Sequence, residues 1–210
     1  MGRCWRSAVL AVCMCAMTSA DASAQVAFID AGLNQSYTSS DALGSPLGFS
    51  VVVGGLGLLG PLGLEVSYRD LSEGAGQIAQ TCEMLECTPG PFDRSFSLRT
   101  IGVGISYDIE NPTDVMLTLG LHGATNRQTE NLRNVETGVR TDAGESDPDY
   151  SVGFSADLRL RPVMARLRPA FTVRYDRVSQ GSCPAGASCF RGRDVVSISA
   201  GVSWVQRAKR

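Results

Sequence analysis

Residues 95–109, SFSLRTIGVGISYDI, decide the fold. From Thr100 onward, small or polar residues alternate with apolar ones, so that threonine, glycine, serine and aspartate occupy the even positions. Alternation with a period of two predicts a β-strand with one apolar and one polar face. The odd positions hold Ile101, Val103, Ile105, Tyr107 and Ile109.

The same alternation recurs along the chain, whereas a helical period does not. Residues 46–58 depart from it, because they are apolar at both parities and rich in glycine, which predicts a bulged strand. The whole pattern predicts an all-β fold of eight antiparallel strands. These strands are residues 26–38, 46–58, 62–70, 95–109, 114–126, 149–161, 167–177 and 194–206.

The predicted connections alternate in length from the second one onward. A turn at Gly60-Pro61 precedes a long loop, and the tight turn at residues 110–113 precedes another. Short turns on one side and long loops on the other are typical of up-and-down barrels in the bacterial outer membrane, and they place the N-terminus on the periplasmic side. The long loops are residues 71–94, 127–148 and 179–193.

The first residues predict export. Arg3 and Arg6 precede an apolar run over residues 8–17, and Ala22-Ser23-Ala24 is an A-x-A cleavage pattern. The apolar run is too short for a membrane-spanning helix, which needs about 20 residues. We therefore expect three segments: a signal peptide over residues 1–24, a barrel over 25–206 and a basic tail over 207–210.

The positions of the aromatic residues predict which face meets lipid. They lie on the apolar parity near the ends of the strands, as two belts would require. A soluble barrel of the lipocalin kind would also alternate, with its apolar face inward, and stays an alternative. The predicted aromatic girdle consists of Tyr37, Tyr68, Tyr107, Tyr150, Tyr175 and Trp204.

The polar parity predicts a narrow, filled lumen. It is rich in glycine and serine, and its five acidic and five basic residues permit complete ion pairing. By height along the strands, Glu65 and Asp30 are expected near Arg159, Arg161 and Arg168, and Asp176 near Arg69 and Arg174. The predicted lumenal ion-pair network is Asp30, Glu65, Arg69, Asp108, Asp157, Arg159, Arg161, Arg168, Arg174 and Asp176.

The cysteines that remain after cleavage predict disulfides. An even number in an exported chain favours disulfides over a metal site. Four cysteines allow three connectivities, and we prefer the local one, within each loop. The pairs are then Cys82 with Cys87 and Cys183 with Cys189.

No catalytic constellation is found in the sequence. His122 is the only histidine, and its parity places it in the lumen, away from a lipid substrate. The near-balanced net charge of −2 predicts no nucleic-acid partner, and no cofactor or metal motif is present. We therefore expect a protein that is not an enzyme.

From about residue 26 to 206 the chain resembles the OmpA/OmpX-like family of eight-stranded barrels, on strand count, loop alternation and length. The resemblance implies a bacterial outer-membrane barrel with a packed polar core and variable external loops. Expected partners are outer-membrane lipid and lipopolysaccharide, the barrel-assembly machinery, and an unidentified loop partner. The assembly machinery commonly recognises an aromatic residue at the end of the chain. In this sequence the last aromatic residue is Trp204, and a basic tail follows it. The predicted role is structural or surface interaction, with a small pore as an alternative.

Overall fold

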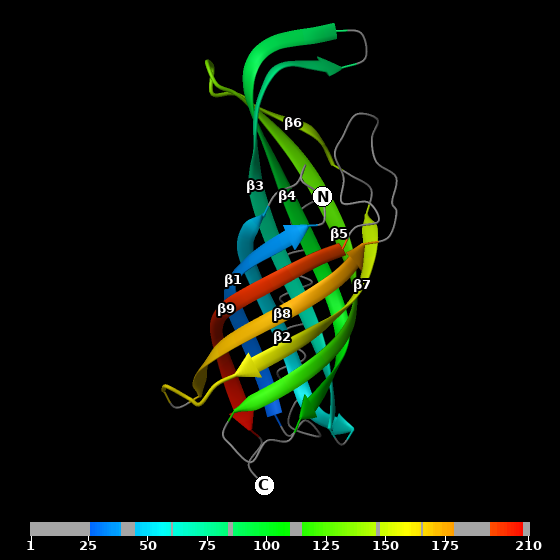
Figure 1. Cartoon of the computed structure of the whole chain (residues 1–210), viewed down its shortest axis with the longest axis vertical. Coiled ribbons are helices and arrows are strands. Elements are labelled where there is room, and N and C mark those ends of the chain that lie inside the picture. Colours follow the sequence, from blue (N-terminus) through cyan, green and yellow to red (C-terminus); the bar gives the residue numbers. More distant parts are fainter. Residues whose placement is uncertain are drawn as a thin grey trace, which may run out of the picture.

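The computed structural model describes residues 26–38, 45–59, 61–83, 86–109, 115–145, 148–164, 166–178 and 194–207. All regular elements in this part of the chain are strands (Figure 1). Among these residues, no helix is long and apolar enough to cross a membrane. The strands are β1 (Val26–Thr38), β2 (Leu47–Leu59), β3 (Leu62–Glu83), β4 (Glu86–Ile109), β5 (Met116–Asn134), β6 (Arg140–Glu145), β7 (Asp149–Arg159), β8 (Leu167–Val178) and β9 (Asp194–Arg207).

Eight of these strands form a closed ring. The order is β4-β3-β2-β1-β9-β8-β7-β5, and pairing of β4 with β5 closes it. Every pairing is antiparallel, and β6 pairs with β5 beyond the ring. Closure leaves no unpaired edge in the wall, as a barrel in lipid requires. The predicted eight-stranded antiparallel barrel is therefore confirmed.

The strand pattern also confirms the irregularity expected in residues 46–58. The pairing of β2 with β3 shifts register between Gly55 and Leu59. Gly57 lies in this interval with a φ of 79°, which a residue with a side chain rarely adopts. The glycine-rich stretch thus bends the strand just before its turn.

Two predicted loops are wrong, because strands occupy most of them. Residues 71–94 continue β3 and begin β4, and only residues 84–85 separate the two strands. Residues 127–148 likewise continue β5 to Asn134 and contain β6. Their polar composition suggested loops, but a sheet that extends into water needs no apolar alternation on its outer face. In Figure 1, β3 and β4 rise far beyond the rest of the ring.

We call the end of the barrel with connections 60–61, 110–115 and 160–166 the turn end, and the opposite end the loop end. The predicted signal peptide lies outside the described residues. Of the predicted tail, only Arg207 is described, as the last residue of β9.

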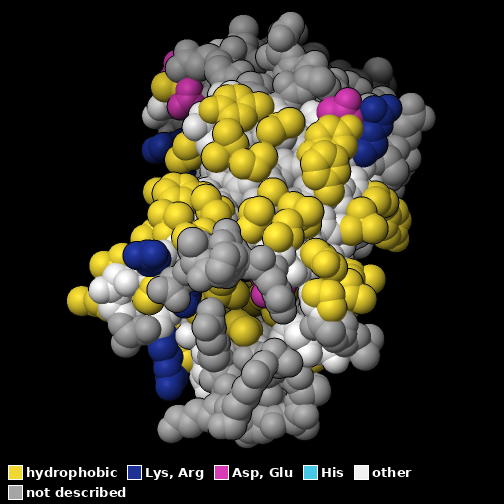
Figure 2. Space-filling model, turned by 60° about the horizontal axis from the view of Figure 1, so that its bottom comes forward, with side chains coloured by type: hydrophobic (Ala, Val, Ile, Leu, Met, Phe, Trp, Pro, Cys, Tyr) yellow, Lys and Arg dark blue, Asp and Glu magenta, His cyan; other side chains and the backbone are white. Residues whose placement is uncertain are grey.

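The side chains point as a membrane barrel requires. Leu33, Val103 and Leu121 on the outer wall are 71%, 63% and 63% exposed, whereas charged residues of the other parity are buried. Figure 2 shows the apolar side chains as a broad band on the wall, with charged side chains at its margins. A soluble lipocalin-like barrel needs the opposite orientation, with the apolar face enclosed.

Glycines make the inner wall narrow enough to close. A Cβ atom at Gly153 would lie 2.0 Å from the Tyr175 carbonyl oxygen and 2.7 Å from His122 Nε2. A Cβ atom at Gly201 would lie 2.0 Å from the Ala31 carbonyl oxygen. Neighbouring backbone fills the space that a larger residue would need, so these positions require glycine.

Candidate functional site

The middle of the lumen holds a cluster centred on Asp176 of β8. Its carboxylate accepts bonds from Arg69 Nη2 at 2.7 Å and Arg174 Nε at 3.1 Å, and His122 Nε2 lies 2.8 Å away. The strands β3, β5 and β8 supply these groups, so Asp176 links opposite parts of the wall. Arg69 also donates to Ser197 at 3.1 Å, and Arg174 donates to Ser67 at 3.1 Å.

A second cluster lies nearer the turn end. Arg159 is fully buried, and its Nη2 and Nε lie 2.5 and 3.2 Å from the two carboxylate oxygens of Asp30. Its Nη1 donates to Thr118 at 2.9 Å, and the guanidinium carbon lies 4.0 Å from the centre of the Phe28 ring. One side chain thus bridges the lumen with charge, hydrogen bonds and a cation–π contact.

Glu65 and Asp157 lie in the same section of the lumen. Asp157 accepts hydrogen bonds from Thr172 at 2.6 Å and Ser155 at 3.3 Å. Glu65 is only 6% exposed, and its Oε2 has no hydrogen-bond partner among the described residues. A carboxylate buried in this way loses hydration without compensation.

A cavity of about 30 Å³ lies beside these groups, with room for about two water molecules. Glu65, Arg69 and Arg174 all border it. Each has a buried polar atom without a partner in the described chain: Glu65 Oε2, Arg69 Nε and Arg174 Nη2. The cavity is thus bordered by one hydrogen-bond acceptor and two donors. Buried water molecules typically connect unpaired groups of this kind.

Of the remaining residues of the predicted ion-pair network, Arg168 and Asp108 are at least partly buried, whereas Arg161 is exposed. Arg168 is buried in the lumen, and Asp108 is half-buried near the end of β4. The prediction for Arg161 is wrong, because Arg161 is exposed at the turn end. Strand β7 ends at Arg159, so the alternation that placed Arg161 inward no longer holds two residues later.

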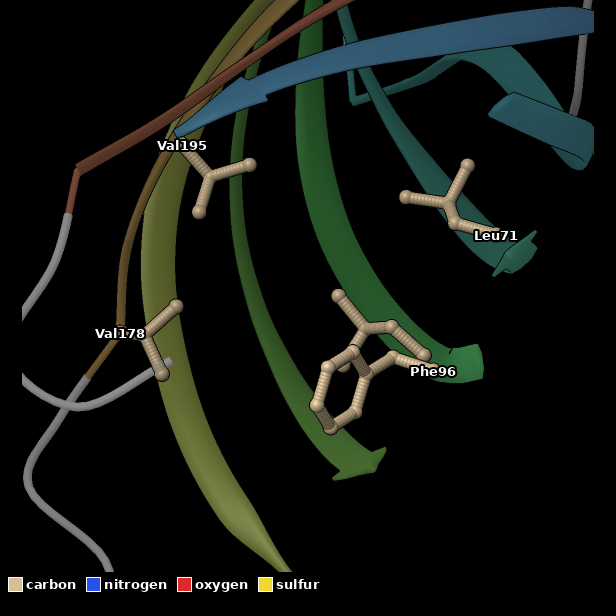
Figure 3. Close-up of a cluster of buried hydrophobic side chains, with 5 residues drawn as sticks. Leu71, Phe96, Val178 and Val195 are labelled. Carbon is tan, nitrogen blue, oxygen red and sulfur yellow. The ribbon is translucent and has the colours of Figure 1, made fainter. Parts of the chain in front are cut away.

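Apolar side chains cluster near both ends of the lumen, which corrects the expectation of a packed polar lumen. Near the loop end, side chains from β3, β4, β8 and β9 point toward one another inside the ring (Figure 3). Near the turn end, Phe28, Leu56, Met116 and Val205 pack together. The sequence carried a signal for these, since Phe28 shares the parity of Asp30. The loop-end cluster is Leu71, Phe96, Leu98, Val178 and Val195.

All six residues of the predicted girdle lie on the outer face. Tyr37, Tyr68, Tyr150 and Tyr175 lie toward the loop end, and Tyr107 and Trp204 toward the turn end. The Tyr175 hydroxyl donates to Asp194 at 2.6 Å, beyond the apolar band. This hydrogen bond, with the charge of Arg177 beside it, holds the pKa of Asp194 below its ordinary value.

The cysteines are described only in part. The backbones of Cys82 and Cys87 lie directly opposite each other near the tip of the β3–β4 hairpin. Cys183 and Cys189 lie outside the described residues. In the described part of the chain, no group of three histidine, cysteine, aspartate or glutamate residues is placed to hold a metal ion.

A closed ring of eight antiparallel strands, with an apolar outer wall and an ion-paired interior, defines a transmembrane β-barrel. No family model matches the sequence, and no curated protein matches it either.

Solved structures of similar fold are outer-membrane barrels. Neisserial surface protein A matches with a TM-score of 0.54 at 18% identity, over 85% of this chain and 95% of that one. Ail of Yersinia pestis, in complex with the heparin analogue sucrose octasulfate, matches with 0.54 at 12% identity, over 86% and 98%. A major outer membrane protein from Thermus thermophilus matches with 0.55 at 13% identity, over 86% and 99%. The resemblance to OmpA/OmpX-like barrels thus holds for the fold.

Proposed function

We propose that this chain is a bacterial outer-membrane protein that acts through its loop end, as a structural or surface-interaction protein without enzymatic activity. Residues 1–24 would serve as its cleaved signal peptide, and the barrel-assembly machinery would insert it. One observation carries the proposal. The lumen is filled and capped, whereas the loop end extends a sheet of strands β3, β4, β5 and β6 beyond the barrel.

The filled lumen argues against the pore alternative. An ion that crossed the barrel would have to displace the Arg159–Asp30 pair, which is buried and held by several bonds. It would also have to pass an apolar cluster at each end, where no polar group replaces its hydration. Both barriers arise from side chains that pack against each other, so opening requires rearrangement of the core.

The extended sheet supports the surface role. Lipid-embedded barrels place short turns in the periplasm and longer segments outside the cell. The loop end would then face the exterior and present the β3–β4 and β5–β6 hairpins. The Yersinia barrel of the same fold that was solved with a heparin analogue supports treating such surfaces as binding surfaces.

One set of experiments tests both which end of the barrel faces the cell exterior and whether its lumen is closed to ions. A cysteine placed in the β5–β6 turn (Thr137→Cys) is expected to react with a membrane-impermeant maleimide on intact cells. Val163→Cys at the turn end is the matched control, and it should react only after the outer membrane is opened. The wild-type chain reports the background from its own cysteines. The purified barrel should show no conductance in planar bilayers. Equal labelling of both variants, or steady conductance, would contradict the proposal.

The disulfides remain part of the proposal. Because Cys82 and Cys87 lie directly opposite across two paired strands, a short link between them is compatible with the backbone. We expect non-reducing peptide mapping of the exported protein to recover these two cysteines in one linked peptide, and Cys183 with Cys189 in another. In the chain-entropy model each local link stabilises its segment by roughly 2 kcal/mol. Recovery of Cys82 linked to Cys183 would overturn the local connectivity.

A further inference from the structure

Strand β1 carries an amide on the lipid-facing wall. Its outward residues occupy the odd positions, and Gln35 lies between Leu33 and Tyr37 in this series. The register places Leu47 of β2 and Ile198 of β9 opposite Gln35 on its two sides. These four neighbours are 45% to 71% exposed, so Gln35 is surrounded by side chains that meet lipid.

Gln35 differs from the rest of this wall. Between the two aromatic girdles, it is the only outward side chain of the described strands that carries an amide or a charge. Thr125 is also polar, but it lies in the girdle row with Tyr68 and Tyr150. Its hydroxyl donates to the Ile101 carbonyl oxygen at 3.5 Å. The Gln35 amide makes no hydrogen bond to the residues that the structure describes.

An amide at this position is unfavourable when only acyl chains surround it. Acyl chains offer no hydrogen-bond partner, so burial of an amide among them costs free energy. Tyr37 is the girdle residue of β1, and Gln35 precedes it by two residues, or about 7 Å along the strand toward the hydrocarbon. A partner with hydrogen-bonding groups at the same depth would remove this cost.

A second copy of the chain supplies such a partner. An amide side chain has two N–H donors and a carbonyl acceptor, so two of them can exchange a pair of hydrogen bonds. Two copies with the same orientation in one membrane are related by a two-fold axis along the membrane normal, which keeps every residue at its own depth. When that axis passes beside Gln35, the two amides meet. The patch is therefore self-complementary, as a two-fold interface requires.

The surface beside Gln35 also allows close approach. Leu33 is 71% exposed, and its partner on β9 is Ala200, which is exposed as well. Ala31 precedes Leu33 on the same face and is exposed. The two alanines leave a shallow depression, in which a leucine of the second copy can pack. Membrane helices associate through the same combination of small residues and polar side chains.

We propose that the outer face of strands β1 and β9 is the interface of a homodimer within the membrane, in which the two copies of Gln35 are hydrogen-bonded to each other. The seam between β4 and β5 lies on the opposite side of the ring and stays in lipid. Both loop ends of the dimer then face the same side of the membrane, which would raise the avidity for a repetitive surface partner. The proposal rests on the membrane location proposed above.

The experiment uses the full mature chain, labelled at its N-terminal amine and folded into phospholipid vesicles. Single-molecule photobleaching over a range of protein-to-lipid ratios counts the copies per complex and gives a dissociation constant in the membrane. Gln35→Leu removes the amide. Its matched control is Gln206→Leu, because Gln206 is an exposed, outward amide of β9 beyond Trp204. Ala200→Trp obstructs the proposed interface, and Val103→Trp places the same bulk on β4, across the ring.

We expect the wild-type chain to change from single to paired copies as the protein-to-lipid ratio rises. The dissociation constant of Gln35→Leu should be about tenfold higher, as loss of hydrogen bonding in a membrane predicts. Ala200→Trp should stay monomeric, whereas Gln206→Leu and Val103→Trp should pair as the wild type does. Gln35→Leu should not lower the free energy of unfolding, because an apolar side chain suits this wall. Heat-modifiable migration on a gel confirms that each variant folds.

Three results would overturn the interface. They are a wild-type chain that stays monomeric at every ratio, equal dissociation constants for Gln35→Leu and the wild type, and equal weakening by Ala200→Trp and Val103→Trp. A wild-type chain that does not enter the vesicles would instead overturn the membrane location.

Discussion

The Asp176→Ala variant is expected to lose about 3–5 kcal/mol of its free energy of unfolding, the range for breaking a buried charge pair from one side. Asp176 is 1% exposed and lies within 3.1 Å of Arg69, Arg174 and His122. Without it, two guanidinium groups stay buried with only hydroxyl partners. The measurement is urea unfolding of the barrel in phospholipid vesicles, followed by the fluorescence of Trp204.

Two further variants separate the ion pairs from burial alone. Glu65 is buried almost as deeply, but its Oε2 has no partner in the described chain, so Glu65→Gln should not lower the free energy of unfolding. Adding Arg174→Met to Asp176→Ala should cost less than the two single losses combined, because one unpaired charge is removed with its partner. If Glu65→Gln is as damaging as Asp176→Ala, the cluster around Asp176 has no special role.

The wall of the barrel could be predicted because a strand in a membrane barrel has two different solvents. Lipid on one side and packed charge on the other force a period of two, which Ile101 to Ile109 shows plainly. The same parity brought Asp30 and Arg159 into one lumen although 129 residues separate them. Neither inference needed knowledge of distant contacts.

The loop-end sheet could not be predicted in this way. Beyond the membrane, the outer face of β3 and β4 no longer meets lipid, so polar residues such as Ser95 and Ser97 are compatible with either a strand or a loop. Backbone pairing between β3 and β4 determines the structure there. The composition of a single segment does not reveal which segment it pairs with.

The two apolar clusters at the ends of the lumen could have been predicted from the sequence, but the charged residues on the same parity drew attention away from them. Phe28 and Leu71 fall on the lumenal parity, beside Asp30 and Arg69, and a residue-by-residue parity count would have placed them inside. The physical reason for the caps is geometric. Where the ion pairs end, the lumen still has to be filled, and apolar side chains fill it without unpaired polar groups.

The orientation of the wall has a sharper test. Leu121→Arg is expected to cost about 2–4 kcal/mol of free energy of unfolding in lipid vesicles, the range for an arginine at the middle of a bilayer. Leu121 is 63% exposed, pairs with Ile105, and lies between the girdle row at Thr125 and the partner of Tyr107, Leu119. At an equally exposed position of a water-soluble protein, the change would stay within about 0.5 kcal/mol.

Thr125→Arg is the matched control, because it lies on the same strand and the same face, in the row of Tyr68 and Tyr150. At this interfacial depth an arginine can extend its charge into the headgroups, and the cost should fall to about 0–1 kcal/mol. The two sites differ mainly in their depth in the membrane. Equal costs at Leu121 and Thr125 would mean that the apolar wall does not face hydrocarbon, and an apolar partner surface would have to cover it instead.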